Sequence, residues 1–275
     1  MKELHFIYNM HCEFSVPITE HCFTLKCIPQ TDDFQKVTIE KQEIKNADWI
    51  SCGKDSYGNQ YIYGKEKKPH TLFEVNIEGS VQVDREGPQQ RENYPYAASR
   101  STKYTFLDKN MEQYLLKILE RKKAKELFLK YDENSFQRFL FEVMQGVFAY
   151  MEYAPGMTTT NTTAAEAFSL RQGVCQDYAH ILITFYRALH IPAIYIAGYM
   201  LGEGASHAWV SAMNPETKKW YEIDPTNNKW VDNDYISVAI GADASDCVIN
   251  RGIFYGMTEE KQVITVSVKE EKNYQ

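Results

Sequence analysis

Apolar and polar residues alternate along the first part of the chain in the manner of β-strands. From Leu4 to Phe14 every second residue is apolar, which is the period-two pattern of a strand with one buried face. Turn residues such as those at 55–59 separate this segment from later strands. We therefore predict an antiparallel β-sandwich or barrel-like domain over residues 1–95. Its other predicted strands are Cys22–Ile28, Lys36–Ile44, Gln60–Tyr63, Thr71–Ile77 and Val81–Asp84.

The pattern changes to a helical period after residue 106. The stretch 92–106 has no clear period and contains a proline, so we interpret it as the crossing between a domain 1–95 and a domain 96–275. Asp108 is a good N-cap for a helix that we expect to extend as far as Leu129. Asn134 or Ser135 begins a second helix that ends before Pro155-Gly156, and a short helix is predicted at Ala164–Leu170.

The stretch from Arg171 to His190 predicts a helix with a cysteine in its first turn. Gly173 allows a sharp turn before the helix, and Cys175 then meets unpaired backbone N–H groups and the positive end of the helix dipole. Such a setting favours a thiolate over a thiol. A lone cysteine beside an apolar helix is more often a small buried hydrophobe. The interpretation as a nucleophile therefore depends on partners elsewhere in the chain.

Those partners are predicted on a hairpin further along. An apolar strand at Ala193–Met200 precedes two alternating segments, Ser206–Met213 and Lys219–Asp224, with a turn between them. A hairpin centred between Pro215 and Glu216 places His207 directly opposite Asp224, with Cβ atoms about 4.5–5.5 Å apart. Because only the turn sets this register, a slip by one or two residues stays open. A cysteine, a histidine and an aspartate are the residue types of a nucleophilic triad. We predict that Cys175, His207 and Asp224 form one.

Composition and charge exclude several other classes of function. The chain has 275 residues and a net charge of −7, and basic residues are interspersed with acidic ones, so we expect no nucleic-acid partner. No apolar run approaches the ~20 residues that span a bilayer, and no signal peptide is visible. We therefore expect no membrane partner, a cytoplasmic location and reduced thiols for the six cysteines.

Metal binding is not favoured by the spacing of the candidate ligands. Histidines and cysteines cluster at His11-Cys12, His21-Cys22 and Cys27, but the paired C-x₂₋₄-C and H-x₃₋₅-H arrangement of structural zinc is missing. Alternation along the strand also puts His11 and Cys12 on opposite faces. The sequence has no calcium-ligand run either. We expect neither a metal nor a cofactor.

Three runs of residues resemble a known family. GVCQDYAHILITFYRALHIPAIYIAGYM, SHAWV and WYEIDPTN strongly resemble the bacterial transglutaminase-like superfamily of papain-related thiol enzymes. MHCEFSVPI, LKCIPQ and DSYGN are similar to the β-rich region that often precedes this domain in bacteria, and YISVAIGADASDC with GIFYG is similar to the family's C-terminal part. The resemblance implies an α+β fold, with a papain-like core of helices packed on an antiparallel sheet.

The resemblance also implies a chemistry. Cys175 would attack a carboxamide or peptide carbonyl, His207 would hold the ion pair and protonate the leaving amine, and Asp224 would orient the imidazole. The backbone N–H of Cys175 would hold the oxyanion together with a second donor, for which Tyr153 and Gln176 are the candidates. The implied substrate is a peptide or protein. The sequence does not determine the oligomeric state.

The triad alone does not choose between the possible reactions. Water gives a cysteine protease or amidase, which the resemblance to bacterial members favours, whereas an amine gives a transglutaminase; deamidation of glutamine is a further alternative. A non-catalytic binding or scaffold domain also remains open. The chain departs from the family at Ser211, where an acidic residue is common, and at Ala242, where arginine is common. His180 and Cys247 are predicted to have structural roles.

Overall fold

The alternating N-terminal segment forms one long strand instead of two. The structure, a computed structural model, describes residues 1–85, 89–90, 96–121 and 133–271. In it, strand β1 runs over Lys2–Leu25, and every second side chain from Leu4 to Phe14 is at most 4% exposed. The register of β1 against its neighbour β5 shifts between Glu13 and Ile18. Because Pro17 has no N–H to give to a ladder, the strand bends there and continues.

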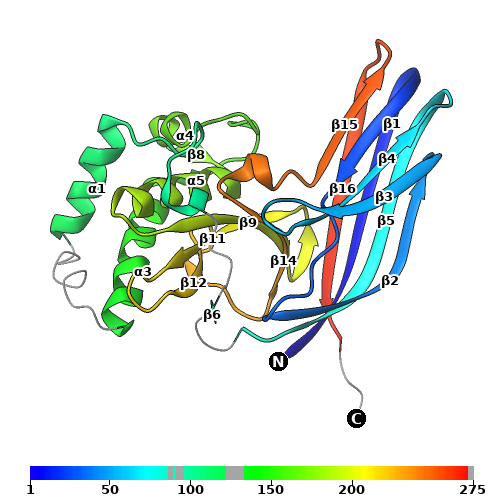
Figure 1. Cartoon of the computed structure of the whole chain (residues 1–275). Helices are drawn as coiled ribbons and strands as arrows, with labels where there is room; N and C mark the ends of the chain where they lie inside the picture. The colour runs from blue at the N-terminus through cyan, green and yellow to red at the C-terminus, as the bar shows by residue number, and fades with distance from the viewer. Residues whose placement is uncertain (86–88, 91–95, 122–132, 272–275) are drawn as a thin grey trace.

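The strands around β1 form a large curled antiparallel sheet (Figure 1). The separate strands predicted at 71–77 and 81–84 are a single strand, because Gly79 continues the pairing where a side chain could not. A Cβ at Gly79 would lie 2.4 Å from the carbonyl oxygen of Thr38. Besides β1, the sheet contains β2 (Gln35–Lys45), β3 (Trp49–Lys54), β4 (Gln60–Glu66), β5 (His70–Val83), β10 (Gly202–Gly204), β15 (Asn250–Tyr255) and β16 (Glu260–Glu270).

The strands β3 and β10 were not predicted from the sequence, and neither were the last two, β15 and β16. These last two bring C-terminal residues to the N-terminal sheet. β16 runs antiparallel to β1 from Leu4 opposite Glu270 to Phe14 opposite Glu260, and its other edge pairs with β10. β15 pairs with the second half of β1. The sheet of the first half therefore includes strands from the C-terminal region. The division into 1–95 and 96–275 stays a prediction, and residues 91–95 at that boundary lie outside the described residues.

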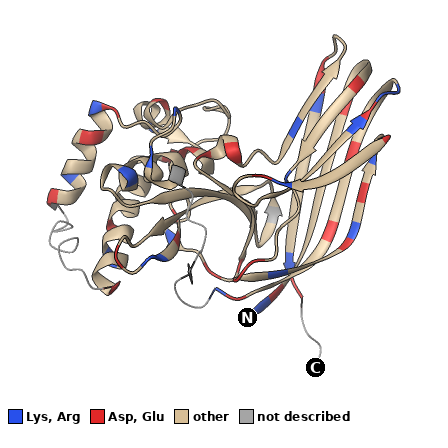
Figure 2. Ribbon diagram, in the orientation of Figure 1, with Lys and Arg blue, Asp and Glu red and all other residues tan. Residues whose placement is uncertain are grey.

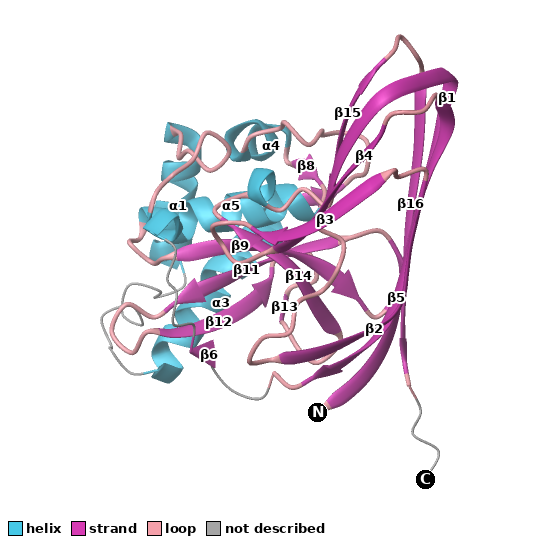
Figure 3. Cartoon of the chain, turned by 45° about the vertical axis from the view of Figure 1, so that its right-hand side comes forward, coloured by secondary structure: helices cyan, strands magenta, loops and turns pink. Residues whose placement is uncertain are grey.

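A second antiparallel sheet has helices on one side (Figure 3). The predicted α+β fold, with helices packed on an antiparallel sheet, is thereby confirmed. The strands are β6 (Gln89–Gln90), β9 (Ala193–Met200), β11 (His207–Met213), β12 (Lys219–Asp224), β13 (Lys229–Trp230) and β14 (Tyr235–Gly241). The helices are α1 (Lys109–Arg121), α3 (Glu133–Tyr150), α4 (Ala164–Leu170) and α5 (Cys175–Ala188), with 3₁₀ turns η1 (Tyr96–Ser99) and η2 (Ala244–Asp246). The predicted continuation of the first helix to residue 129 lies outside the described residues.

The two sheets meet along β14. Side-chain amides form hydrogen bonds with backbone groups on the outer edge of this strand. Asn59 donates to the carbonyl of Ile240 at 2.7 Å and accepts from its N–H at 2.8 Å, and Gln35 makes the same pair of bonds with Ser237. Both amides are at most 2% exposed. Because the buried backbone groups of an edge strand need partners, these two residues fix the N-terminal sheet against the second sheet.

Charge is distributed over both halves of the molecule without segregation of sign (Figure 2). Lys and Arg alternate with Asp and Glu along the long strands and on helix α1. Among the described helices, none is both long enough and apolar enough to cross a membrane.

Candidate active site

The segments before α5 deliver the cysteine to the helix start. Thr163 caps α4 by accepting from the N–H of Glu166, whose carboxylate accepts from the N–H of Thr163 in return. Arg171 then turns the chain with a left-handed φ of 56°. The chain next runs as a short strand, β8 (Gln172–Gly173), parallel to β7 (Glu152–Tyr153). This pairing sets Tyr153 beside the turn that precedes Cys175.

A buried carboxylate organises that turn. Asp177 is 1% exposed, and its Oδ2 accepts from the N–H of Val174 at 2.8 Å and from the hydroxyl of Thr158 at 2.7 Å. Burial raises the pKa of Asp177, and the two hydrogen bonds oppose that rise. A Cβ at Gly173 would lie 2.5 Å from Asp177 Oδ2, so only glycine leaves room for this carboxylate. As predicted, α5 begins at Cys175, which is half-buried.

The hairpin that carries the histidine and the aspartate has a different register from the predicted one. Met213 lies opposite Trp220, whereas a turn centred between Pro215 and Glu216 would have placed it opposite Lys218. The reason is the five-residue loop 214–218, in which Asn214 Oδ1 accepts from the N–H groups at 216 and 217, and Lys218 adopts φ 60°. A shift by two residues keeps every side chain on its face.

The structure still brings the three predicted residues together. His207 Nε2 lies 2.7 Å from Asp224 Oδ2, and Cys175 lies near enough to His207 to raise the pKa of the imidazole. Burial lowers the pKa of His207, but the hydrogen bonds to Asp224 and Cys175 and the charges of both partners outweigh it and raise the pKa to about 9. The imidazolium is therefore the favoured form at neutral pH.

Asp224 is fully buried, and several hydrogen-bond donors stabilise the negative charge of its carboxylate. Its Oδ2 accepts from the Tyr235 hydroxyl and the Asn227 amide, each at 2.7 Å, besides His207. Its Oδ1 accepts from the backbone N–H groups of Thr226 and Asn227 at 2.8 and 3.1 Å. Burial raises the pKa of Asp224, but these bonds lower it below its ordinary value overall. Sequence reasoning missed Tyr235 and Asn227. The Asx turn after Asp224 was a local signal for Asn227, whereas Tyr235 had no signal.

Behind the histidine lies a buried ion pair that was also not predicted. The Trp209 ring packs against the His207 ring with centroids 6.3 Å apart, and its Nε1 donates to Glu222 Oε2 at 2.9 Å. Arg85, from the N-terminal part of the chain, donates to the same oxygen at 2.7 Å, and both charged side chains are only 3% exposed. A remote arginine therefore fixes the residues that support His207.

The two candidate oxyanion donors, Tyr153 and Gln176, differ in their exposure and in their hydrogen bonds. Tyr153 is 56% exposed; partial burial and the nearby sulfur of Cys175 raise the pKa of its hydroxyl, which therefore keeps its proton as a donor. The Gln176 amide donates to the carbonyl of Thr160 at 3.3 Å. Gln176 would have to break this contact to serve the site, so Tyr153 is the better candidate.

His180 and Cys247 lie in the interior beside η2. His180 is fully buried and its Nε2 accepts from the N–H of Ala244 at 3.0 Å. Burial lowers its pKa to about 4. Burial also raises the pKa of the Cys247 thiol, which lies 4.0 Å from the carbonyl of Tyr195. Ala242, one of the departures from the family pattern, offers its carbonyl to the buried guanidinium of Arg187 at 2.7 Å. The other departure, Ser211, is fully buried.

One group among the described residues could geometrically hold a metal ion. It consists of His5, Glu40 and Glu78 on three neighbouring strands of the N-terminal sheet. His5 Nε2 lies 3.3 Å from Glu78 and 3.6 Å from Glu40. Partly exposed histidine–carboxylate ion pairs have the same distances without a metal ion. The group contains none of the three predicted catalytic residues.

The sequence matches known proteins over most of its length. The family model of the transglutaminase-like superfamily matches residues 122–225. An uncharacterised protein of Mycobacterium tuberculosis is 31% identical over 244 residues, which cover 79% of this chain and 76% of that protein. An uncharacterised protein of Mycobacterium leprae is 36% identical over 116 residues, which cover 38% and 40% of the two chains.

The fold resembles that of a solved structure as well. A protein from Cytophaga hutchinsonii, described as a candidate cysteine protease, superimposes with a TM-score of 0.69. The alignment covers 100% of this chain and 92% of the other, at 21% sequence identity. At that identity, the likeness concerns the fold.

Proposed function

This chain belongs to the transglutaminase-like superfamily, and from that premise we propose that it is a cysteine-dependent hydrolase of peptide or protein amides. Cys175 is the nucleophile, His207 its acid–base partner and Asp224 the residue that orients the imidazole. The observation that carries the proposal is the 2.7 Å contact between Asp224 Oδ2 and His207, together with the proximity of His207 to Cys175 at the first turn of α5. Nucleophile, base and orienter therefore lie next to one another.

The proposed reaction uses these groups in two steps. The sulfur of Cys175 attacks the carbonyl carbon, and the oxyanion accepts from the backbone N–H of Cys175, which as a first-turn group has no acceptor within the helix, and from Tyr153. The C–N bond breaks as the imidazolium of His207 gives its proton to the leaving amine, and a thioester remains. Water, deprotonated by the neutral imidazole, then attacks the thioester and releases the acid and the free thiol.

The electrostatics of the pair support the first step. A histidine with a pKa of about 9 is protonated at neutral pH, so it can both stabilise a thiolate and donate to the leaving group. The hydrogen bond to Asp224, whose carboxylate is held by five hydrogen bonds, is the main cause that raises the pKa of His207. Hydrolysis is favoured over amine transfer because the Cytophaga hutchinsonii protein with the same fold is described as a protease.

The pH dependence of cysteine alkylation tests the nucleophile. We expect iodoacetamide to label Cys175 rapidly well below pH 8.5, the ordinary value for a free thiol, and to do so much more slowly in His207→Ala. Peptide mapping by mass spectrometry separates Cys175 from Cys52, whose exposed thiol gives an internal reference rate. Equal and slow labelling of both thiols in both proteins would overturn the proposal.

The products distinguish the reactions. A glutamine-containing peptide should yield two shorter peptides on hydrolysis of its backbone, an added amine on transamidation, or a glutamate in place of glutamine on deamidation. We expect the shorter peptides, in equal amount with and without a primary amine, and none with Cys175→Ala. Rapid alkylation without any of these products would favour a protein that binds peptides without turning them over.

A further inference from the structure

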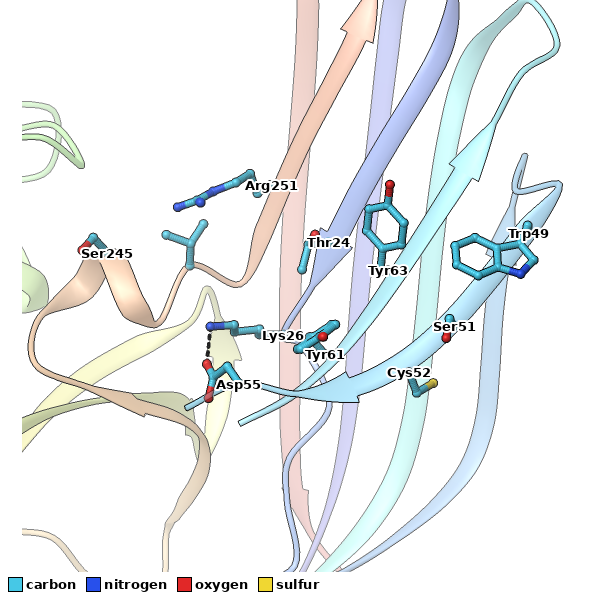
Figure 4. A pocket seen from close by; sticks show the side chains of 11 residues that line it. Thr24, Lys26, Trp49, Ser51, Cys52, Asp55, Tyr61, Tyr63, Ser245 and Arg251 are labelled. Carbon is cyan, nitrogen blue, oxygen red and sulfur yellow. Dashed lines mark hydrogen bonds and ion pairs between the residues drawn. The ribbon is translucent and has the colours of Figure 1, made fainter. Parts of the chain in front are cut away.

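An open groove of about 490 Å³ lies on the N-terminal sheet, apart from the three catalytic candidates. We call it the aromatic groove (Figure 4). Its floor is the face of β1, β3, β4 and β15 that points away from the N-terminal core, and its wall is the segment that contains η2. The residues that line it are Thr24, Lys26, Trp49, Ser51, Cys52, Asp55, Tyr61, Tyr63, Ser245, Val248 and Arg251.

Strand pairing arranges the floor as cross-strand rows. Arg251 lies opposite Thr24, Thr24 opposite Tyr63, and Tyr63 opposite Ser51. With strands about 4.8 Å apart, this row spans roughly 14 Å. Figure 4 shows Arg251 at one end of the groove and the Trp49 ring at the other. An extended peptide advances about 3.3 Å per residue, so roughly four residues reach from one end to the other.

The charged end presents one guanidinium, that of Arg251, for which the described part of the chain supplies no counter-ion. Lys26 pairs with Asp55 at 2.6 Å, and Lys65 on the same face pairs with Glu20. Arg251 is exposed and forms no ion pair with any of the described residues. The chain as a whole carries a net charge of −7. An unpaired arginine on an acidic protein, next to an apolar surface, suits a carboxylate that it can bind with two parallel hydrogen bonds.

The other end presents aromatic rings that the fold leaves uncovered. Trp49 is 54% exposed and Tyr63 38% exposed, and their rings meet edge to face at 5.7 Å. Ile253 and Tyr255 continue this face along β15. Exposed apolar patches of this kind mark sites of interaction, and tryptophan, tyrosine and arginine are the residue types that dominate binding energy in such sites.

The wall of the groove is connected to the catalytic helix. Ser245 belongs to η2, whose Ala244 N–H donates to His180 on α5. Between the wall residues Ser245 and Val248 lies Cys247, which packs on Tyr195. Burial raises the pKa of Tyr195, and the sulfurs of Cys175 and Cys247 both add to the rise. Tyr195 therefore lies near both the thiol proposed as nucleophile and the cysteine behind the groove wall.

We propose that the aromatic groove binds an extended segment of the protein substrate, which carries a carboxylate side chain at Arg251 and an aromatic or large apolar side chain, about four residues away, at Trp49 and Tyr63. The identity of the occupant as substrate rests on the proposed function. The groove thereby selects acidic, aromatic segments at a distance from the bond that Cys175 attacks.

Fluorescence anisotropy with defined peptides tests the groove. The probe is a fluorescein-labelled Gly/Ser decapeptide with one Glu and one Phe separated by three residues, and its partner probe has Gln in place of Glu. Both are titrated onto Cys175→Ala protein, so that turnover does not consume them. We expect the Glu probe to bind at least about fivefold more tightly than the Gln probe, as for one charge-assisted contact.

The variants separate the two ends of the groove. Arg251→Gln should remove the preference for the Glu probe and leave the Gln probe unchanged, whereas Trp49→Ala should weaken both probes. Arg138→Gln, an exposed arginine on α3, is the matched control and should change neither. The exposed Cys52 thiol lines the groove and reports the location, because a bound probe should slow its alkylation by iodoacetamide.

Three outcomes would overturn the inference: equal binding of the two probes, an unchanged preference in Arg251→Gln, or no binding of either probe at about 1 mM, the weak end of peptide recognition. Thermal unfolding of each variant checks that the fold is intact. Failure of the proposed function has a separate signature, because Cys175 would then label slowly in wild type while the probes still bound. Rapid labelling of Cys175 in wild type, together with no binding of either probe, would overturn the groove proposal and leave the proposed function standing.

Discussion

Replacement of Asp224 by Asn should change the protonation of His207 more than any other single change in the second sheet. The carboxylate accepts five hydrogen bonds, three of them at Oδ2. An asparagine side chain offers one acceptor oxygen and one NH₂ donor. Whichever way it turns, its NH₂ group faces donors that Asp224 satisfied, and the negative charge next to His207 is lost.

The size of the effect follows from the pKa of His207. Its rise from 6.5 to about 9 corresponds to about 2.5 pKa units, or on the order of 3 kcal/mol at 1.36 kcal/mol per unit. Cys175 supplies part of this rise, after the hydrogen bond to Asp224. In Asp224→Asn the pKa of His207 should therefore fall by at least about one unit. In Cys175→Ala it should fall by less, because the aspartate remains.

Titration of the His207 ring by NMR measures this pKa directly, and unfolding by urea at several pH values measures its consequence. Because the folded-state pKa of His207 is raised, the stability that its protonation contributes is complete below pH 6.5. It is lost as the pH rises from 6.5 through about 9. The free energy of unfolding of wild type should fall over this window by up to on the order of 3 kcal/mol, and that of Asp224→Asn by much less.

Asp232→Asn provides the matched control, since Asp232 is an exposed carboxylate that pairs with Lys229. It should leave the titration of His207 unchanged. The reasoning would be refuted if His207 of wild type titrated at 6.5 or below, or if Asp224→Asn and Asp232→Asn gave the same His207 pKa.

Three further changes test the framework around the site. Gly173→Ala puts a Cβ 2.5 Å from Asp177 Oδ2, so it should destabilise the fold by about 1–3 kcal/mol and slow cysteine labelling; a melting temperature equal to that of wild type would contradict this. Glu222→Gln leaves the charge of Arg85 buried without its counter-ion and should cost about 3–5 kcal/mol in urea unfolding, whereas Met at both positions should cost less; the opposite order would be inconsistent with a buried ion pair. Tyr235→Phe removes one donor to the Asp224 carboxylate, which should cost about 1 kcal/mol. The folded-state pKa of the Asp224 carboxyl is lowered, so the stability that the ionised carboxylate contributes is lost as the pH falls through that pKa. Tyr235→Phe should raise this pKa, so that acid unfolding begins at a higher pH than in wild type.

Local patterns in the sequence were sufficient for the strands β9, β11 and β12 and for the helices α3, α4 and α5, but not for β6, β13 and β14. Gly173 before an apolar helix, and Pro215 between two alternating segments, each determine an element from its own residues. For this reason α5 begins at Cys175 as expected. The hairpin register was wrong by two residues because the side chain of Asn214 organises a longer loop. A proline indicates a turn without stating its length.

Pairings between distant segments could not be predicted in this way. Arg85 reaches Glu222 across 137 positions, and nothing in either residue's neighbourhood identifies its partner. Gln35 and Asn59 appear in the sequence as ordinary loop amides, and only the meeting of the two sheets shows that they cap β14. Tyr235 belongs to an apolar strand like any other, so its hydroxyl contact with the candidate triad depends on tertiary packing alone.

The pairing of β16 with β1 also affects how the chain can be made. Cys12 and Glu260 are in contact although 248 positions separate them. During synthesis, the long first strand therefore leaves the ribosome well before the strand that covers one of its edges exists. Until then β1 presents an unprotected row of N–H and C=O groups, which is a template for pairing with other chains. Nascent chains halted before residue 260 should depend on chaperones to stay unaggregated, and full-length chains should not.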